Sequence, residues 1–300
     1  MKLTPRLALL LTLPPLLWAG NAVVGRLVRD AIPPMTLNAL RWGLAFLLLA
    51  PLAWPLLRHP GEALKRWRGL AWLGFLGMGC YNALQYLALH TSSPLNVTLI
   101  TASLPVWMLG IGAVFYGVKP QRRQLAGAAL SLLGVALVIA RGEPAALLAV
   151  RFVPGDLLML VAIFTWAIYS WMLARPAPGL RPGEKPDWTW AESLMSQLMF
   201  GAVFSALSAG VEQTLAPTPI HWSPALIAAL AYVAIGPSLI AYRCWGVGVA
   251  EAGPALAGFF VNLTPVFAAL ISAVLLGSAP AWYHGAAFAL IVAGILVSSR

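Results

Sequence analysis

The chain consists of long apolar segments separated by short polar ones. No Asp, Glu, Lys or Arg occurs between Gly69 and Val118, or between Ala252 and Ser299. An α-helix needs about 20 mostly apolar residues to cross the roughly 30 Å of bilayer hydrocarbon, and segments of this length recur along the chain. They predict ten membrane-spanning helices, at residues 7–25, 34–57, 69–89, 95–117, 124–140, 154–174, 190–211, 224–249, 254–277 and 282–298.

Composition supports this reading, because 60% of the residues are apolar and only 9% are charged, against about 25% charged in soluble proteins. A water-soluble globular protein is excluded. The net charge of +10 would suggest a nucleic-acid partner in a soluble chain. Here the basic residues lie in short loops between apolar spans, so we expect a lipid bilayer as the surroundings and no nucleic acid as a partner.

The distribution of Lys and Arg predicts the orientation, since cytoplasmic loops of membrane proteins are enriched in these residues. If the N-terminus is cytoplasmic, the outer loops hold only Arg26, Arg29, Arg141 and Arg151. The inner segments then hold Lys2, Arg6, Arg58, Lys65, Arg66, Arg68, Lys119, Arg122, Arg123, Arg175, Arg181, Lys185 and Arg300. Both termini are therefore predicted to be cytoplasmic. The N-terminal segment is similar to a signal peptide, but nine further spans favour an uncleaved first helix.

The sequence contains an internal repeat. A shift of 160 residues places Pro94 on Pro254, Pro105 on Pro265 and Gly134 on Gly294, and Trp18 matches Trp166 at a shift of 148. Each repeat holds five predicted spans, and an odd number makes the second repeat enter the membrane from the opposite side. The sequence thus predicts two inverted five-helix units, residues 1–141 and 142–300, and alternating access as their mechanism. The alternative is a duplication kept only to build a large bundle.

Polar and aromatic side chains inside the spans predict a central cavity, because polar groups in hydrocarbon are costly unless they face a cavity or a partner. Such a cavity suits a small aromatic or amphipathic solute. Alternatively, these residues hold helices together or lie at the membrane surface. The candidate substrate-binding residues are Trp18, Asn21, Tyr81, Asn82, Gln85, Asn96, Trp107, Trp166, Tyr169 and Asn262. We expect Trp166→Ala or Tyr81→Ala to impair transport without impairing folding.

Two cations, Arg41 and Arg243, also fall within predicted spans. Either is a candidate contact for a substrate carboxylate, although a long basic side chain can instead extend to the membrane surface. Pro105, Pro237 and Pro265 interrupt spans and are candidate hinges, because each removes a backbone hydrogen bond.

Enzyme chemistry is not expected. The sequence lacks the GxSxG, HExxH, Walker A and GxGxxG motifs. Cys80 and Cys244 lie in apolar spans without a CxxC pattern, and all nine acidic residues lie near predicted span ends or in loops. We therefore predict no catalytic residues, no metal and no cofactor.

The order of these features resembles the EamA-type members of the drug/metabolite transporter superfamily. The resemblance rests on the ten spans, the Trp18-Ala19-Gly20-Asn21 run, Arg41-Trp42, and prolines 105 and 265 in spans four and nine. It implies a basket-like transporter fold with a central cavity, in the bacterial inner membrane. The aromatic candidates make the chain most similar to the aromatic amino acid exporters, which implies a neutral, aromatic amino acid or a related metabolite as substrate.

Other functions stay open alongside this resemblance. One is another solute carrier of the superfamily, for a drug or a nucleotide sugar, and the other is an intramembrane enzyme or scaffold. The small four-helix drug antiporters depend on a membrane-embedded Glu that this sequence lacks. Nucleotide sugars are anionic and would favour more basic cavity residues than Arg41 and Arg243.

Overall fold

The protein is an all-α bundle in the part of the chain that the structure, a computed structural model, describes: residues 3–92, 94–143, 145–148, 151–276 and 281–299. Lys2, Arg300 and residue 277, where the ninth span is predicted to end, lie outside these ranges.

The helices follow the predicted spans closely, except that the second span, predicted at 34–57, forms a helix that ends at Leu49 and a separate short helix from Trp54 to Arg58. The first half contains α1 (Pro5–Val28), α2 (Pro34–Leu49), α3 (Trp54–Arg58), α4 (Gly61–Lys65), α5 (Trp67–Gly74), the π-helix η1 (Phe75–Cys80), α6 (Tyr81–Thr91), α7 (Pro94–Ala102), α8 (Leu104–Tyr116), α9 (Arg122–Ile139) and α10 (Ala145–Leu148). The second half contains α11 (Pro154–Ala174), α12 (Trp190–Leu215), α13 (Pro224–Val233), the π-helix η2 (Ala234–Ile240), α14 (Ala241–Ala252), α15 (Pro254–Val261), α16 (Thr264–Leu276) and α17 (Trp282–Ser299).

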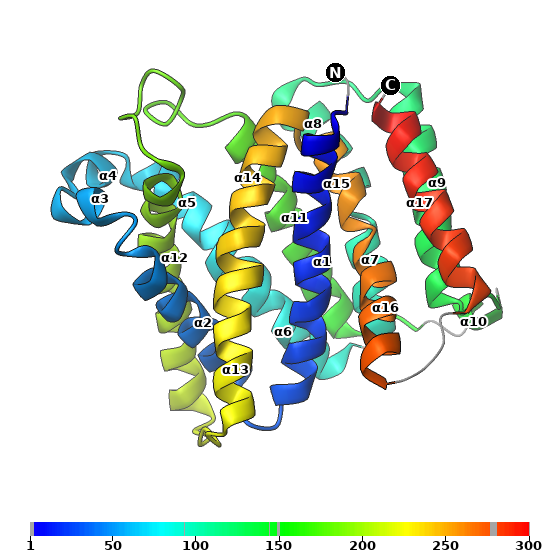
Figure 1. The fold of residues 1–300 in the computed structure, drawn as a ribbon, viewed down its shortest axis with the longest axis horizontal. Coiled ribbons are helices and arrows are strands. Elements are labelled where there is room, and N and C mark those ends of the chain that lie inside the picture. The colour runs from blue at the N-terminus through cyan, green and yellow to red at the C-terminus, as the bar shows by residue number, and fades with distance from the viewer. Residues whose placement is uncertain (1–2, 93, 144, 149–150, 277–280, 300) are drawn as a thin grey trace.

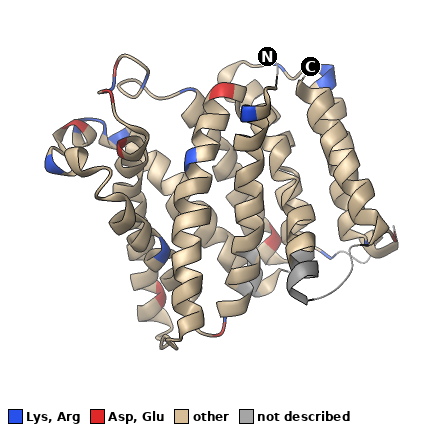
Figure 2. Ribbon diagram, in the orientation of Figure 1, with Lys and Arg blue, Asp and Glu red and all other residues tan. Residues whose placement is uncertain are grey.

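Length and hydropathy identify the membrane-spanning elements. Among the described residues, seven helical segments are long and apolar enough to cross a bilayer, and the bent α7–α8 pair is an eighth. The short apolar helix α2 and the continuous α5–η1–α6 segment complete the ten predicted spans. The two marked termini lie at the same end of the bundle, as an even number of crossings requires (Figure 1). Lys and Arg gather mainly toward that end (Figure 2).

Spans four and nine are broken at matching places. Helix α7 ends at Ala102 and α8 begins at Leu104, with a bend of 41° between them. Helix α15 ends at Val261 and α16 begins at Thr264. Pro105 and Pro265 are the second residues of α8 and α16. Proline has no N–H to donate to the preceding turn, so the chain breaks just before each of them.

Spans three and eight share a second irregularity. A shift of 160 residues carries η1 onto all but the first residue of η2, so the two π-helices occupy matching positions of the two halves. Pro237 lies inside η2. A π-helix widens the turn to an i→i+5 hydrogen-bond pattern and frequently marks a functional site.

The contact between α9 and α17 has the symmetry of an inverted repeat. A Cβ atom added to Gly127 would lie 2.6 Å from the Gly294 carbonyl oxygen, and one added to Gly134 would lie 2.9 Å from that of Ala287. The 160-residue shift carries Gly127 to Ala287 and Gly134 to Gly294, so each close approach is the image of the other. Two surfaces that contact each other in this reciprocal way are related by a two-fold axis.

The other helices pack in the same reciprocal way. Helix α1 packs against α14 and α16 of the second half, whereas α11 packs against α6 and α8 of the first. The structure is therefore a ten-helix membrane fold built from two inverted five-helix repeats.

Helix α12 also holds the first turn of α2. The residue before α2 is Pro33, which provides no side-chain cap. Instead the Glu212 carboxylate accepts hydrogen bonds from the backbone N–H groups of Met35 (2.9 Å) and Thr36 (2.8 Å), and from the Thr36 hydroxyl (2.9 Å). A negative charge at a helix N-terminus is favourable, because the first N–H groups have no partner within the helix.

Replacing Glu212 by alanine is expected to destabilise the protein by about 1–2 kcal/mol, because the first turn of α2 loses its acceptor. Thermal unfolding of the purified protein measures this effect. Glu251→Ala is the matched control, because Glu251 forms an exposed ion pair with Arg6 (3.2 Å), and such pairs contribute little. Equal melting temperatures for the two variants would show that the cap of α2 is unimportant.

Candidate substrate site

An aromatic cluster fills the seam between the two halves. Trp166 of α11 lies at its centre, with ring centroids 5.2 Å from Trp18 of α1, 5.0 Å from Tyr81 of α6 and 5.0 Å from Tyr169. Two residues of α14 complete it, Tyr242 at 5.5 Å and Trp245 at 5.6 Å from Trp166. We call these six residues the aromatic cluster.

The Trp18–Trp166 pair marks the symmetry of the site. The two residues occupy equivalent positions of the two repeats at the 148-residue shift, and their rings contact each other nearly edge to face, at 88°. Equivalent residues that touch must lie next to the two-fold axis. The central pair of rings therefore lies at the symmetry axis, with one ring from each half.

The cluster is closely packed. Trp166 is 3% exposed and Trp245 is fully buried, whereas Trp18 and Tyr81 are half-buried. Rings at these distances form edge-to-face and tilted contacts. Each such contact stabilises the structure by about 0.5–1.5 kcal/mol in addition to the free energy from burying the apolar area.

Hydrogen bonds connect the cluster to both π-helices. The Trp18 indole N–H donates to the Pro237 carbonyl of η2 (3.2 Å), and the Tyr242 hydroxyl donates to the Gly77 carbonyl of η1 (2.5 Å). Each bond runs from one half of the protein to the π-helix of the other half. Ring positions are therefore coupled to the irregular turns of spans three and eight.

Arg41 lies in the middle of α2 and is 1% exposed. Its Nε donates to the Ser238 hydroxyl of η2 (2.5 Å) and its Nη1 donates to Asn82 Oδ1 of α6 (3.3 Å). The guanidinium carbon lies 5.1 Å from the ring of Trp42, which in turn is 5.0 Å from Tyr242. Arg41 and Asn82 therefore border the aromatic cluster.

Asn21 and Gln85 lie on helices of the cluster. Asn21 follows Trp18 by three residues on α1 and is 8% exposed, and its Oδ1 accepts no hydrogen bond from the residues that the structure describes. Gln85 follows Tyr81 by one turn on α6 and is half-buried.

The remaining predicted residues have partners elsewhere. Asn96 donates to the Asp156 carboxylate (2.7 Å) at the start of α11, and Asn262 donates to Ser131 of α9 (2.8 Å). The ring of Trp107 contacts Phe164. Arg243 is exposed, and its guanidinium carbon lies 4.2 Å from the ring of Trp190. Within the described part of the chain, none of these contacts involves the aromatic cluster.

Sequence reasoning missed Tyr242, Trp245, Trp42 and Ser238. For the first two a signal was present, because the 160-residue shift carries Asn82 to Tyr242 and Gln85 to Trp245. Both positions on the first repeat were already candidates. Mapping every candidate through the repeat would therefore have found the aromatic residues of α14.

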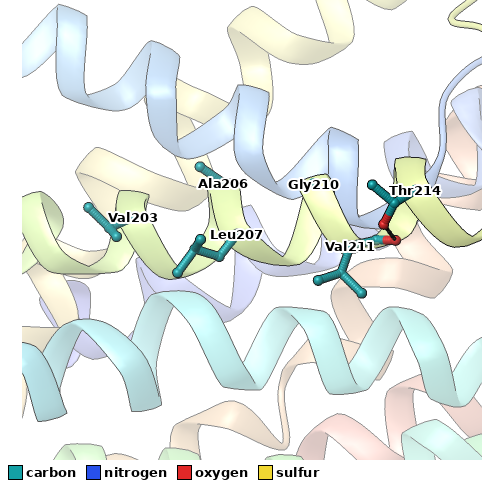
Figure 3. A pocket seen from close by; sticks show the side chains of 6 residues that line it. All are labelled: Val203, Ala206, Leu207, Gly210, Val211 and Thr214. Atoms are coloured by element: carbon teal, nitrogen blue, oxygen red, sulfur yellow. Dashed lines mark hydrogen bonds between the residues drawn. The ribbon is translucent and has the colours of Figure 1, made fainter.

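Two apolar grooves lie away from this site. One is lined by Val203, Ala206, Leu207, Gly210, Val211 and Thr214 of α12 (Figure 3). The other extends over α2, α12 and α13. Leu207 is 63% exposed and Val211 is 56% exposed, so the first groove belongs to the outer surface of the bundle, where a membrane protein contacts lipid.

The fold and the central site define a multi-pass membrane transporter. Comparison with protein families shows that the chain belongs to the EamA-like transporter family of the drug/metabolite transporter superfamily, which matches residues 6–140 and 153–300. The family thus occurs twice in the chain, once in each half.

Named relatives are similar over nearly the whole chain. An uncharacterized transporter of Archaeoglobus fulgidus is 27% identical, covering 97% of this chain and 96% of its own. The aromatic amino acid exporter YddG of Ancylobacter novellus is 25% identical (95% and 93%), and a probable terminal-alkyne amino-acid exporter of Streptantibioticus cattleyicolor is 28% identical (94% and 90%). A solved crystal structure shares the fold, with a TM-score of 0.76 at 23% identity over 97% of this chain and 95% of that one.

Proposed function

We propose that the protein exports aromatic and other neutral amino acids, or closely related metabolites, across the bacterial inner membrane. The aromatic cluster at the seam between the repeats carries this proposal. Indole and phenol rings bind another aromatic ring through edge and face contacts, and their faces attract an ammonium group. The names of two relatives as amino-acid exporters support the same substrate class.

The proposed mechanism is alternating access. The inverted units, residues 1–141 and 142–300, exchange conformations, so the seam opens first to one side of the membrane and then to the other. Both termini are cytoplasmic in this arrangement. The hinges are Pro105 and Pro265 at the broken spans and Pro237 in η2, because a helix that already lacks a backbone hydrogen bond bends at lower cost.

Counterflow in proteoliposomes tests the function. Purified full-length protein is reconstituted into liposomes preloaded with phenylalanine, and uptake of labelled phenylalanine is measured against protein-free liposomes. We expect unlabelled tryptophan and tyrosine to compete strongly, leucine less strongly, and aspartate and lysine hardly at all. Competition by a nucleotide sugar without competition by aromatic amino acids would instead indicate a nucleotide-sugar carrier.

A further inference from the structure

Arg41 carries a buried charge that has no acidic partner among the described residues. The guanidinium is 1% exposed, and none of the five ion pairs in the described part of the chain involves it. All nine acidic residues lie in loops or within the end turns of helices. Burying an unpaired cation is expensive, and the two side chains that accept hydrogen bonds from Arg41 in the described structure, Ser238 and Asn82, are neutral.

Two further buried donors near Arg41 have no hydrogen-bond partner among the described residues. Asn82 uses its Oδ1 to accept from Arg41, which leaves its Nδ2 buried without a partner. The Nε1 of Trp42, whose ring lies against the guanidinium, is also buried without a partner. Buried donors are normally satisfied. Within the described residues, this region therefore combines one positive charge with two unused N–H donors and contains no acidic side chain.

A buried acceptor that receives no hydrogen bond from the described residues lies one turn before Arg41. Asn38 precedes Arg41 by three residues and so lies on the same face of α2. Its Nδ2 donates to the Met78 carbonyl and the Ser205 hydroxyl, whereas its Oδ1 is buried and accepts no hydrogen bond within the described structure. An ammonium group is the natural donor to such an oxygen.

The donors Arg41, Asn82 and Trp42 lie directly beside the aromatic cluster. Asn82 follows Tyr81 directly in α6, and the ring of Trp42 contacts that of Tyr242 at 5.0 Å. Ser238, which accepts from Arg41, follows Pro237, whose carbonyl accepts from Trp18. A ligand with its ring among the aromatic side chains has Arg41 beside it.

We propose that Arg41, Asn82 and Trp42 form a carboxylate-binding subsite, so that the transported solutes are aromatic or apolar molecules with a free carboxylate. The proposal rests on the proposed function, because it assigns the polar end of the same substrate site. Arg binds a carboxylate through two parallel N–H···O bonds. The subsite selects for the carboxylate independently of the ammonium group.

Two analogues of phenylalanine separate these groups. 3-Phenylpropionate keeps the ring and carboxylate but lacks the ammonium group, whereas phenylalaninamide keeps the ring and ammonium group but has a neutral amide in place of the carboxylate. In the counterflow assay we expect the concentration of 3-phenylpropionate that halves uptake to be lower than that of phenylalaninamide by a factor of about ten or more. This factor corresponds to the loss of one charge-assisted hydrogen bond. Equal competition would overturn the subsite.

Asn82→Asp is the decisive variant. The new carboxylate is nearly the same size as the amide and pairs with Arg41. The fold is therefore retained, and the carboxylate that Asn82→Asp introduces takes the place of the substrate carboxylate. We expect the preference for 3-phenylpropionate over phenylalaninamide to disappear. Arg41→Gln should remove the same preference, and the exposed cation variant Arg243→Gln should keep it. If Arg41 only held α2 against η2, Asn82→Asp would leave the preference unchanged, which would overturn the proposal.

A binding measurement distinguishes failure of the subsite from failure of the proposed function. If the wild-type protein carries no labelled amino acid, the proposed function fails. The melting temperature of the purified protein is then measured with 3-phenylpropionate or phenylalaninamide added. Stabilisation by 3-phenylpropionate alone, lost in Asn82→Asp, supports the subsite, and no stabilisation by 3-phenylpropionate overturns it.

Discussion

Trp166→Ala is expected to abolish transport and to destabilise the protein by about 3–5 kcal/mol, the usual cost of truncating a buried Trp. Trp166 is 3% exposed, and its ring contacts all five other members of the aromatic cluster. Alanine would leave a cavity between the two repeats. This burial changes the sequence-based expectation that the substitution leaves folding intact.

Two other substitutions separate the loss of transport from the loss of stability. Trp166→Phe keeps an aromatic ring at the symmetry axis and should retain a folded protein with reduced transport. Trp107→Ala is the matched control, because Trp107 is half-buried and its ring contacts Phe164 outside the cluster. Counterflow and thermal unfolding are measured for each variant. Wild-type flux in folded Trp166→Ala would exclude Trp166 from the substrate site.

Gly294→Leu is expected to destabilise the protein by about 3 kcal/mol or more, because overpacking here separates two helix backbones. A Cβ atom on Gly294 would lie 2.6 Å from the carbonyl oxygen of Gly127, and backbone cannot move aside as a side chain can. Since α9 and α17 belong to different halves, the substitution acts on the junction between the repeats. The folded yield in detergent, measured by size-exclusion chromatography, should fall sharply.

Gly285→Leu supplies the control on the same helix. No atom of the described residues lies within 4 Å of a Cβ atom at this position, and leucine is a better helix former than glycine by about 1 kcal/mol. Gly285→Leu should therefore be neutral or stabilising. If both leucine variants gave wild-type yield and melting temperature, the close approach of α9 and α17 would be unimportant for folding.

The sequence predicted the spans well because a helix in hydrocarbon must be apolar along its whole length. It placed the second span at 34–57, whereas α2 ends at Leu49 and the separate helix α3 covers Trp54–Arg58. Pro51 and Pro55 lie in this part of the chain, and neither can donate a helical hydrogen bond to the preceding turn. Hydropathy does not register that loss, because proline is compatible with an apolar segment.

The candidate site was predicted only in part, for a different physical reason. Trp18, Tyr81, Trp166 and Tyr169 meet in the aromatic cluster, and Arg41 and Asn82 border it, as a central site requires. Four other candidates have partners elsewhere: Trp107, Asn96, Asn262 and Arg243. The sequence could not separate them from the cluster residues, because a helix that is apolar all round gives no pattern from which its inner face can be identified. Each π-helix also rotates the helical turns that follow it, relative to their positions in a regular α-helix. The wider turns of the π-helices have no signature in residue type, so the rotation could not be anticipated.

The reciprocal contact between α9 and α17 also bears on the history of the chain. Because each half presents the same surface to the other, two separate copies of one five-helix ancestor, inserted in opposite orientations, could already have paired through it. Such an ancestor must adopt both orientations from a single sequence, which forbids a strong bias of Lys and Arg between its loops. Fusion of two genes removes that constraint, and each half is then free to acquire its own charge distribution and its own side of the binding site.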